Sequence, residues 1–119
     1  MVSTSAILSV VSPFLLAALL PLAANAQAAL TCGVLGWDAL GAAPAFYAVN
    51  NPASATPAAC KKLCQTPSIT PKCASFAVGN SSCLLYTNSA ANQVNANTGS
   101  LYAYYDVNCA VPAAVAFSA

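Results

Sequence analysis

Six cysteines are the residues of this chain whose type and spacing could do chemistry. They are Cys32, Cys60, Cys64, Cys73, Cys83 and Cys109. A zinc site usually takes close cysteine pairs from both halves of the site, and here only Cys60 and Cys64 form such a pair. A redox-active dithiol would need two cysteines separated by two residues, a spacing that is absent. An even cysteine count behind an apolar leader instead predicts three disulfides, with no metal and no cofactor.

Six cysteines allow fifteen pairings, so the count alone does not choose among them. Geometry narrows the choice, because Cys60 and Cys64 are one helical turn apart and face the same way. Each would bond to the sheet beneath the helix, where Cys73 and Cys83 are the partners within reach. The nested solution is Cys64–Cys73, Cys60–Cys83 and Cys32–Cys109, in which the last bridge closes the longest loop.

The clearest predicted helix runs from Pro57 to about Gln65. Thr56 is suited to cap it, and proline is favoured at the first helical position. On this helix Lys61 and Lys62 point away from the face that carries the thiols. We expect short strands near Cys32 and over 45–49, a hairpin over 73–87, a long loop over 88–100 and a final strand over 101–107.

The proposed pairing constrains the register of the hairpin, because Cys73 and Cys83 must both lie on the face that packs against the helix. Side chains alternate along strands, so an unbulged loop of two or four residues would put these two cysteines on opposite faces. We therefore expect a loop of three or five residues, or a bulge near Gly79. The helix-facing set is then Cys73, Ser75, Ala77, Cys83 and Leu85, and the opposite set is Phe76, Val78, Leu84 and Tyr86.

The N-terminal segment 1–26 has the pattern of a signal peptide. An apolar run of signal-peptide length is followed by Pro21 and by a small-residue site that predicts cleavage after Ala26. An uncleaved membrane anchor is the rival interpretation, but the apolar run is short for a span. Cleavage would leave a short segment 27–31, a domain over 32–109 and an apolar tail over 110–119. We expect a secreted or cell-wall protein with no membrane span after cleavage.

Charge is scarce in the whole chain, which has three lysines, two aspartates, and neither histidine nor glutamate nor arginine. A formal net charge of +1 makes nucleic acid a poor partner. No nucleophile–base pair and no carboxylate pair is evident, so we expect no catalytic residue and no enzyme. Asp106 could pair with Lys72 or cap a turn. Few large apolar residues lie between Cys32 and Cys109, so the disulfides are needed for stability.

Several pieces of the chain together resemble the PAN/apple domain family, and in particular the small secreted apple-like proteins of fungi. They are Cys60 and Cys64 with three residues between, Cys73-Ala74-Ser75-Phe76, Cys83-Leu84-Leu85-Tyr86, Tyr104-Tyr105-Asp106 before Cys109, and the opening Cys32-Gly33 with Trp37-Asp38. The resemblance covers 32–109. It implies an α+β fold, with a curved antiparallel sheet, one helix packed across it and the nested disulfides above. It also implies a non-catalytic module for protein or carbohydrate contacts, with no ligand residue carried over.

The leading hypothesis is therefore a secreted recognition module that binds an extracellular glycan or protein at a cell surface or wall. The candidate ligand contacts are Trp37, Tyr102, Tyr104 and Tyr105, because aromatic faces stack on sugars and anchor protein interfaces. Asn80 starts the chain's one N-glycosylation sequon and is the predicted glycan attachment site. The alternative is a surface-active structural coat protein of the wall. It resembles the fungal hydrophobins in composition but lacks their eight cysteines and adjacent cysteine doublets.

Overall fold

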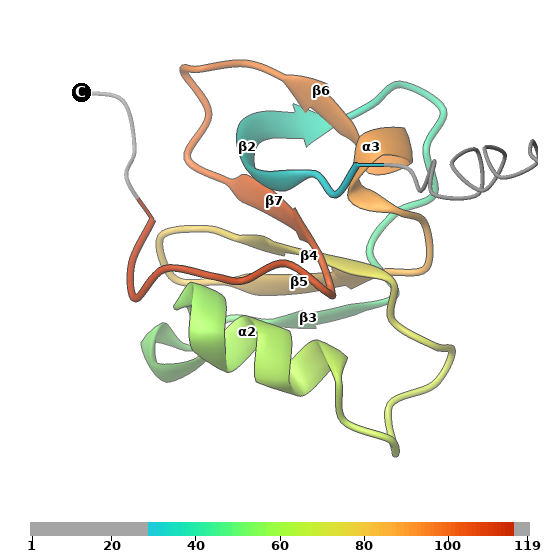
Figure 1. Ribbon diagram of the computed structural model, residues 1–119, viewed down its shortest axis with the longest axis vertical. Helices are drawn as coiled ribbons and strands as arrows, with labels where there is room; N and C mark the ends of the chain where they lie inside the picture. The colour runs from blue at the N-terminus through green and yellow to red at the C-terminus, as the bar shows by residue number, and fades with distance from the viewer. Residues whose placement is uncertain (1–28, 116–119) are drawn as a thin grey trace, which may run out of the picture.

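The computed structural model describes residues 29–115, which form an antiparallel sheet with one helix packed against it. Figure 1 shows this arrangement, and the sheet runs in the order β3-β5-β4-β7-β2-β6. The strands are β2 (Cys32–Asp38), β3 (Tyr47–Val49), β4 (Ser75–Val78), β5 (Cys83–Tyr86), β6 (Val94–Ala96) and β7 (Ala103–Asp106). The helices are α2 (Pro57–Cys64), the short α3 (Ala90–Gln93) and the 3-10 turn η2 (Pro52–Ser54). The expected α+β class is confirmed.

Helix α2 begins where its sequence predicts. The Thr56 hydroxyl accepts a hydrogen bond from the Ala59 N–H at 3.2 Å, and Pro57 occupies the first helical position. Both helix cysteines are buried, whereas Lys62 is exposed. One face of the helix therefore directs both cysteine sulfur atoms toward the sheet.

Three disulfides connect the chain in the nested order. Cys60 joins Cys83 on β5, Cys64 joins Cys73 just before β4, and Cys32 joins Cys109 across 77 positions of sequence. The described residues contain no free cysteine. Two bonds thus attach α2 to the sheet, and the third connects the two ends of the domain.

The predicted register of the hairpin is wrong on β4. The connection Gly79–Ser82 has four residues and no bulge, and Val78 pairs with Cys83 while Phe76 pairs with Leu85. Residues directly opposite share a face, so Phe76 and Val78 face α2 with Cys83 and Leu85. Ser75 and Ala77 face the other side with Leu84 and Tyr86, against the expectation.

The bridge between Cys64 and Cys73 nevertheless forms, because Cys73 precedes β4 and escapes the alternation of the strand. The larger side chains Phe76 and Val78 fill the space under the helix. On the other face, the Ser75 hydroxyl donates to the Asn88 carbonyl at 2.7 Å. Packing volume is consistent with these faces, since the larger side chains lie under α2 and the small Ala77 leaves room for the stacked Tyr86 and Tyr104 on the other face.

The segment 88–100 is more regular than the expected loop. It contains α3 and β6, and β6 pairs with the end of β2, where Trp37 lies opposite Asn95. Strand β2 is correspondingly longer than the short strand expected near Cys32. Three-residue strands and single-turn helices carry too little periodicity to be recognised in a run of Asn, Ala and Ser.

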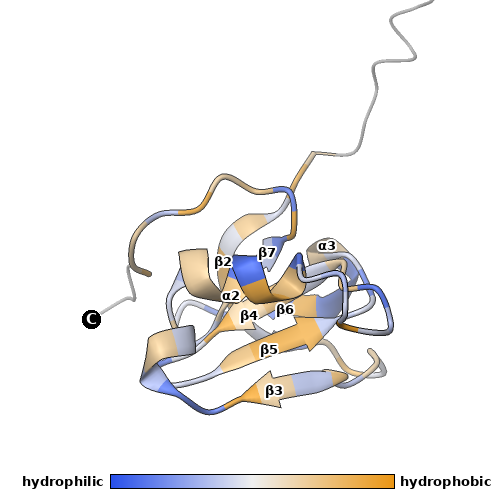
Figure 2. Ribbon diagram, turned by 90° about the horizontal axis from the view of Figure 1, so that it is seen from below, coloured by the Kyte–Doolittle hydropathy of each residue, from blue (hydrophilic) through white to orange (hydrophobic). Residues whose placement is uncertain are grey.

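Hydrophobic clusters lie on both faces of the sheet. On the α2 side, Phe76 and Tyr105 stack with ring centroids 5.3 Å apart, and Val111 and Val115 of the tail pack against this cluster. On the other side, Tyr86 and Tyr104 stack at 5.8 Å. Figure 2 shows hydrophobic residues along the neighbouring strands β4 and β5. The two central strands of the sheet, β4 and β7, are covered on both faces by these clusters.

The expected signal peptide 1–26, its cleavage after Ala26 and part of segment 27–31 lie outside the described residues. Among residues 29–115, no helix is long and apolar enough to cross a membrane.

The three bridges should differ in their contribution to stability. Replacing Cys32 and Cys109 by alanine opens the longest loop and should lower the free energy of unfolding by about 4.5 kcal/mol, as against about 2.6 kcal/mol for Cys64 and Cys73. Urea denaturation of the two double variants measures both losses. Each variant loses two sulfur atoms, so equal losses would contradict the chain-entropy explanation.

Candidate functional site

A hydrogen-bonded group on the face away from α2 fixes the end of β2. The side chains of Tyr86 on β5 and Tyr104 on β7 stack in one buried cluster with the small Ala77 of β4, the strand between them. Both hydroxyls donate to the same oxygen of Asp38, at 2.8 Å and 2.7 Å. Burial, and then the hydrogen bond to Asp38, raise the pKa of both tyrosines above the ordinary range. The carboxylate therefore ties the last residue of β2 to two other strands.

Trp37 precedes this anchored aspartate and is 45% exposed. Its ring meets that of Tyr102 edge-on, with centroids 6.1 Å apart and planes at 62°. The Gly36 N–H donates to the Tyr102 carbonyl at 3.1 Å, so the backbones beneath the two rings are joined as well. We call Trp37 and Tyr102 the aromatic pair.

Gly79 makes the position of Tyr102 possible. A Cβ at residue 79 would collide with the Tyr102 ring, which lies directly over the glycine. The aromatic pair is thus supported from below by the tip of the β4–β5 hairpin. Tyr102 is half-buried by this contact and still borders Trp37.

Two of the four aromatic residues expected at a surface are buried. Tyr104 is 2% exposed and Tyr105 is 3% exposed, because β7 is covered on both faces. Tyr105 stacks on Phe76 under α2, and burial raises its pKa. As ligand contacts these two tyrosines are therefore corrected to core residues. The structure brings together only Trp37 and Tyr102 of the expected set.

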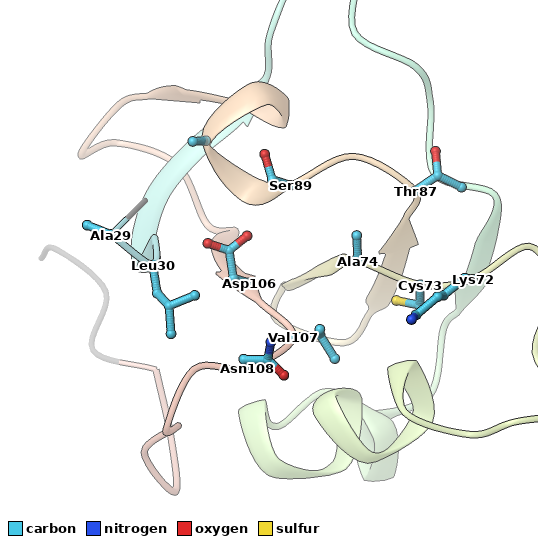
Figure 3. Close-up of a pocket in the computed structure, with 11 residues that line it drawn as sticks. Ala29, Leu30, Lys72, Cys73, Ala74, Thr87, Ser89, Asp106, Val107 and Asn108 are labelled. Atoms are coloured by element: carbon cyan, nitrogen blue, oxygen red, sulfur yellow. The ribbon is translucent and has the colours of Figure 1, made fainter. Parts of the chain in front are cut away.

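A second feature is a hollow of about 550 Å³ near the end of β7 (Figure 3). Figure 3 shows Asp106 directed into it toward Ser89, with Lys72 on the far side. The Asp106 carboxylate accepts from the Thr31 N–H at 2.7 Å and from the Ala90 N–H at 2.8 Å. Of the two expected roles for Asp106, the cap is the one found, since it holds the start of α3.

The hollow offers hydroxyl, amide and ammonium groups from Thr87, Ser89, Asn108 and Lys72, which suit hydrogen bonding to a polar ligand. A second hollow of about 470 Å³ beside Ile69 shares Lys72, Cys73 and Asn108 with it. Sequence reasoning missed this surface. Its walls come from segments that are far apart along the chain, and nothing in the sequence indicates that these segments meet.

The few charged side chains mostly serve the fold. Asp38 and Asp106 bond to tyrosine hydroxyls and backbone N–H groups, and the Lys61 ammonium donates to the Cys109 carbonyl at 2.6 Å. Lys62 and Lys72 remain exposed. Within residues 29–115, no group of three or more His, Cys, Asp or Glu side chains is placed to hold a metal ion. The surface is accordingly close to neutral.

No protein-family model, no curated protein and no solved structure matches this chain. Any functional conclusion therefore rests on the residues and geometry described above.

Removal of the Asp38 carboxylate should destabilise the protein through the two buried tyrosines. Asp38→Ala leaves both hydroxyls without this acceptor, and the expected loss of unfolding free energy is about 2 kcal/mol. Asp38→Asn keeps an acceptor oxygen and should lose less. In a protein that already carries Tyr86→Phe and Tyr104→Phe, Asp38→Ala should lower the free energy of unfolding only slightly. A loss as large as in the parent protein would contradict the role of these two hydrogen bonds.

The same tyrosines predict a loss of stability in alkali. Their pKa is raised in the folded protein, so stability is complete below the unfolded value of about 10 and falls as pH rises above it. Urea denaturation at a series of pH values should show this decline. The tyrosinate absorbance of Tyr86, Tyr104 and Tyr105 should appear together with unfolding, and the Tyr86→Phe, Tyr104→Phe variant should decline less steeply.

Proposed function

We propose that this protein is a secreted, non-catalytic recognition module of the PAN/apple type that binds neutral carbohydrate at a cell surface or wall. The observation that carries the proposal is the aromatic pair, which lies half-exposed on a backbone fixed from several sides. A binding protein for an extracellular protein partner is the runner-up within the same class.

The chemistry of the pair favours carbohydrate. The apolar C–H faces of sugar rings pack against aromatic rings, and indole offers the largest such surface. The charged residues are few, and three of the five are engaged in hydrogen bonds within the protein. A neutral polymer rich in hydroxyl groups suits such a surface better than a polyanion, which requires a positive field.

Pre-organisation of the pair should lower the entropic cost of binding. Trp37 lies between Gly36, which is bonded to Tyr102, and Asp38, which is bonded to two buried hydroxyls. Its opposite neighbour on β6 is Asn95. A residue whose neighbours are fixed in this way and whose ring packs against Tyr102 loses less freedom when a ligand binds, so more of the contact energy contributes to affinity.

The scaffold is compatible with the PAN/apple assignment. One helix lies across an antiparallel sheet, two disulfides attach it there, and the third joins the ends of the domain. These features support the proposal together with the sequence pieces named above, and they concern the frame rather than the ligand.

Binding to insoluble and soluble wall polysaccharides tests the proposal directly. Trp37→Ala should weaken binding by at least about tenfold, the equivalent of one aromatic anchor, without changing the thermal midpoint appreciably. Tyr47→Ala is the matched control, because Tyr47 is 42% exposed on the edge strand β3, at the opposite side of the sheet. Pull-down and isothermal titration calorimetry measure the two variants.

The proposal fails if no neutral glycan binds, or if Trp37→Ala and Tyr47→Ala weaken binding equally. Loss of binding to an extracellular protein upon Trp37→Ala, with no glycan bound, would favour the runner-up. Film formation at an air–water interface, with neither partner bound, would favour the surface-active coat protein.

A further inference from the structure

Asn80 lies at the tip of the β4–β5 hairpin, on the side away from the Tyr102 ring. The Gly79 N–H donates to the Ser82 carbonyl at 2.9 Å, which leaves Asn80 and Ser81 exposed at the turn. Gly79 supports the Tyr102 ring, which packs with the cluster of Ala77 on the face away from α2, whereas Asn80 borders the start of α2. The sequon and the aromatic pair therefore lie on opposite faces of the same hairpin.

Asn80 borders a hollow of about 170 Å³. The rest of its lining comes from Gly79 of the same turn, from Ala55, Thr56 and Pro57 at the start of α2, and from Ala114 and Val115 of the tail. The Thr56 hydroxyl is engaged by the Ala59 N–H, and the walls combine the side chains of Pro57, Ala114 and Val115 with polar groups that include the exposed Asn80 amide. The hollow has room for one sugar ring joined to Asn80, with any further sugars in solvent.

The C-terminal segment 110–115 forms one wall of this hollow, so a group bound there would also contact that segment. Val111 and Val115 pack half-buried against the cluster under α2, and the chain reaches them from Cys109, whose carbonyl is held by Lys61. Beyond these contacts, residues 110–115 form neither helix nor strand. A group that fills the hollow would bridge the hairpin tip, α2 and the tail.

We propose that Asn80 carries an N-linked oligosaccharide whose first N-acetylglucosamine fills this hollow and holds residues 110–115 against the domain. In the transfer, the Asn80 side-chain nitrogen bonds to C1 of the sugar and loses one proton. The bond from C1 to the pyrophosphate of a lipid-linked oligosaccharide donor breaks, and the lipid pyrophosphate leaves. The inference rests on the secretion in the proposed function, and it leaves the aromatic pair uncovered for its ligand.

The test compares glycan forms of the full chain secreted from a eukaryotic host. Intact mass should show one oligosaccharide, and endoglycosidase trimming should leave a single N-acetylglucosamine on Asn80. Hydrogen exchange of the 110–115 amides should be equally slow in the full and trimmed forms. It should be at least about threefold faster in Asn80→Gln, which has no glycan.

Ser82→Thr is the matched control, because it keeps the sequon and a hydroxyl for the 2.7 Å hydrogen bond to Asn50. This variant should behave as the parent does. Absence of added mass at Asn80 would overturn the inference, as would equal exchange in all three forms. Neither result touches glycan binding at Trp37, and a failure of Trp37→Ala to weaken binding would leave Asn80 unaffected, so the two proposals fail separately.

Discussion

The covalent attachment of one helix to a thin sheet is the constraint on which the rest of this structure depends. Cys60 and Cys64 project from one face of α2, and their bonds to Cys83 and Cys73 hold the helix over Phe76 and Val78. A domain of this size buries limited apolar area, so the loss of chain entropy has to be reduced in the unfolded state. With α2 in place, the central strands are covered on that side without a large core.

Two aspartate carboxylates connect separate segments of the chain by hydrogen bonds, as the disulfides connect α2 to the sheet. Asp38 joins β2 to Tyr86 and Tyr104, and Asp106 joins β7 to Thr31 and to the start of α3. These carboxylates receive hydrogen bonds that are stronger because the acceptor is charged. Both aspartates are thereby used for structure, which leaves a surface with little charge and with aromatic and amide groups as its distinctive chemistry.

The proposed ligand-binding pair and the proposed glycan site both lie next to the tip of the β4–β5 hairpin. Its tip presents Gly79 to the Tyr102 ring on one face and directs Asn80 toward the tail on the other. A ligand-binding face and a glycan-bearing face can coexist in so small a domain because Tyr102 covers one side of the hairpin tip and Asn80 borders the start of α2 on the other.

The sequence by itself determined the elements that local chemistry specifies. Thr56 and Pro57 start the helix, turn residues bound the hairpin, and the spacing of Cys60 and Cys64 puts both thiols on one helix face, which favoured the nested bridges. What only the tertiary structure decided are the features that need two distant segments at once. Phe76 faces α2 because that space has to be filled, and β6 pairs with β2 only once the two segments are side by side. Tyr104 and Tyr105 are buried because both faces of β7 are covered. The exposure of Trp37 and Tyr102 was likewise decided by the tertiary structure. Whether a side chain is buried depends on which segments pack against it, and the alternation of residues along a strand does not specify those segments.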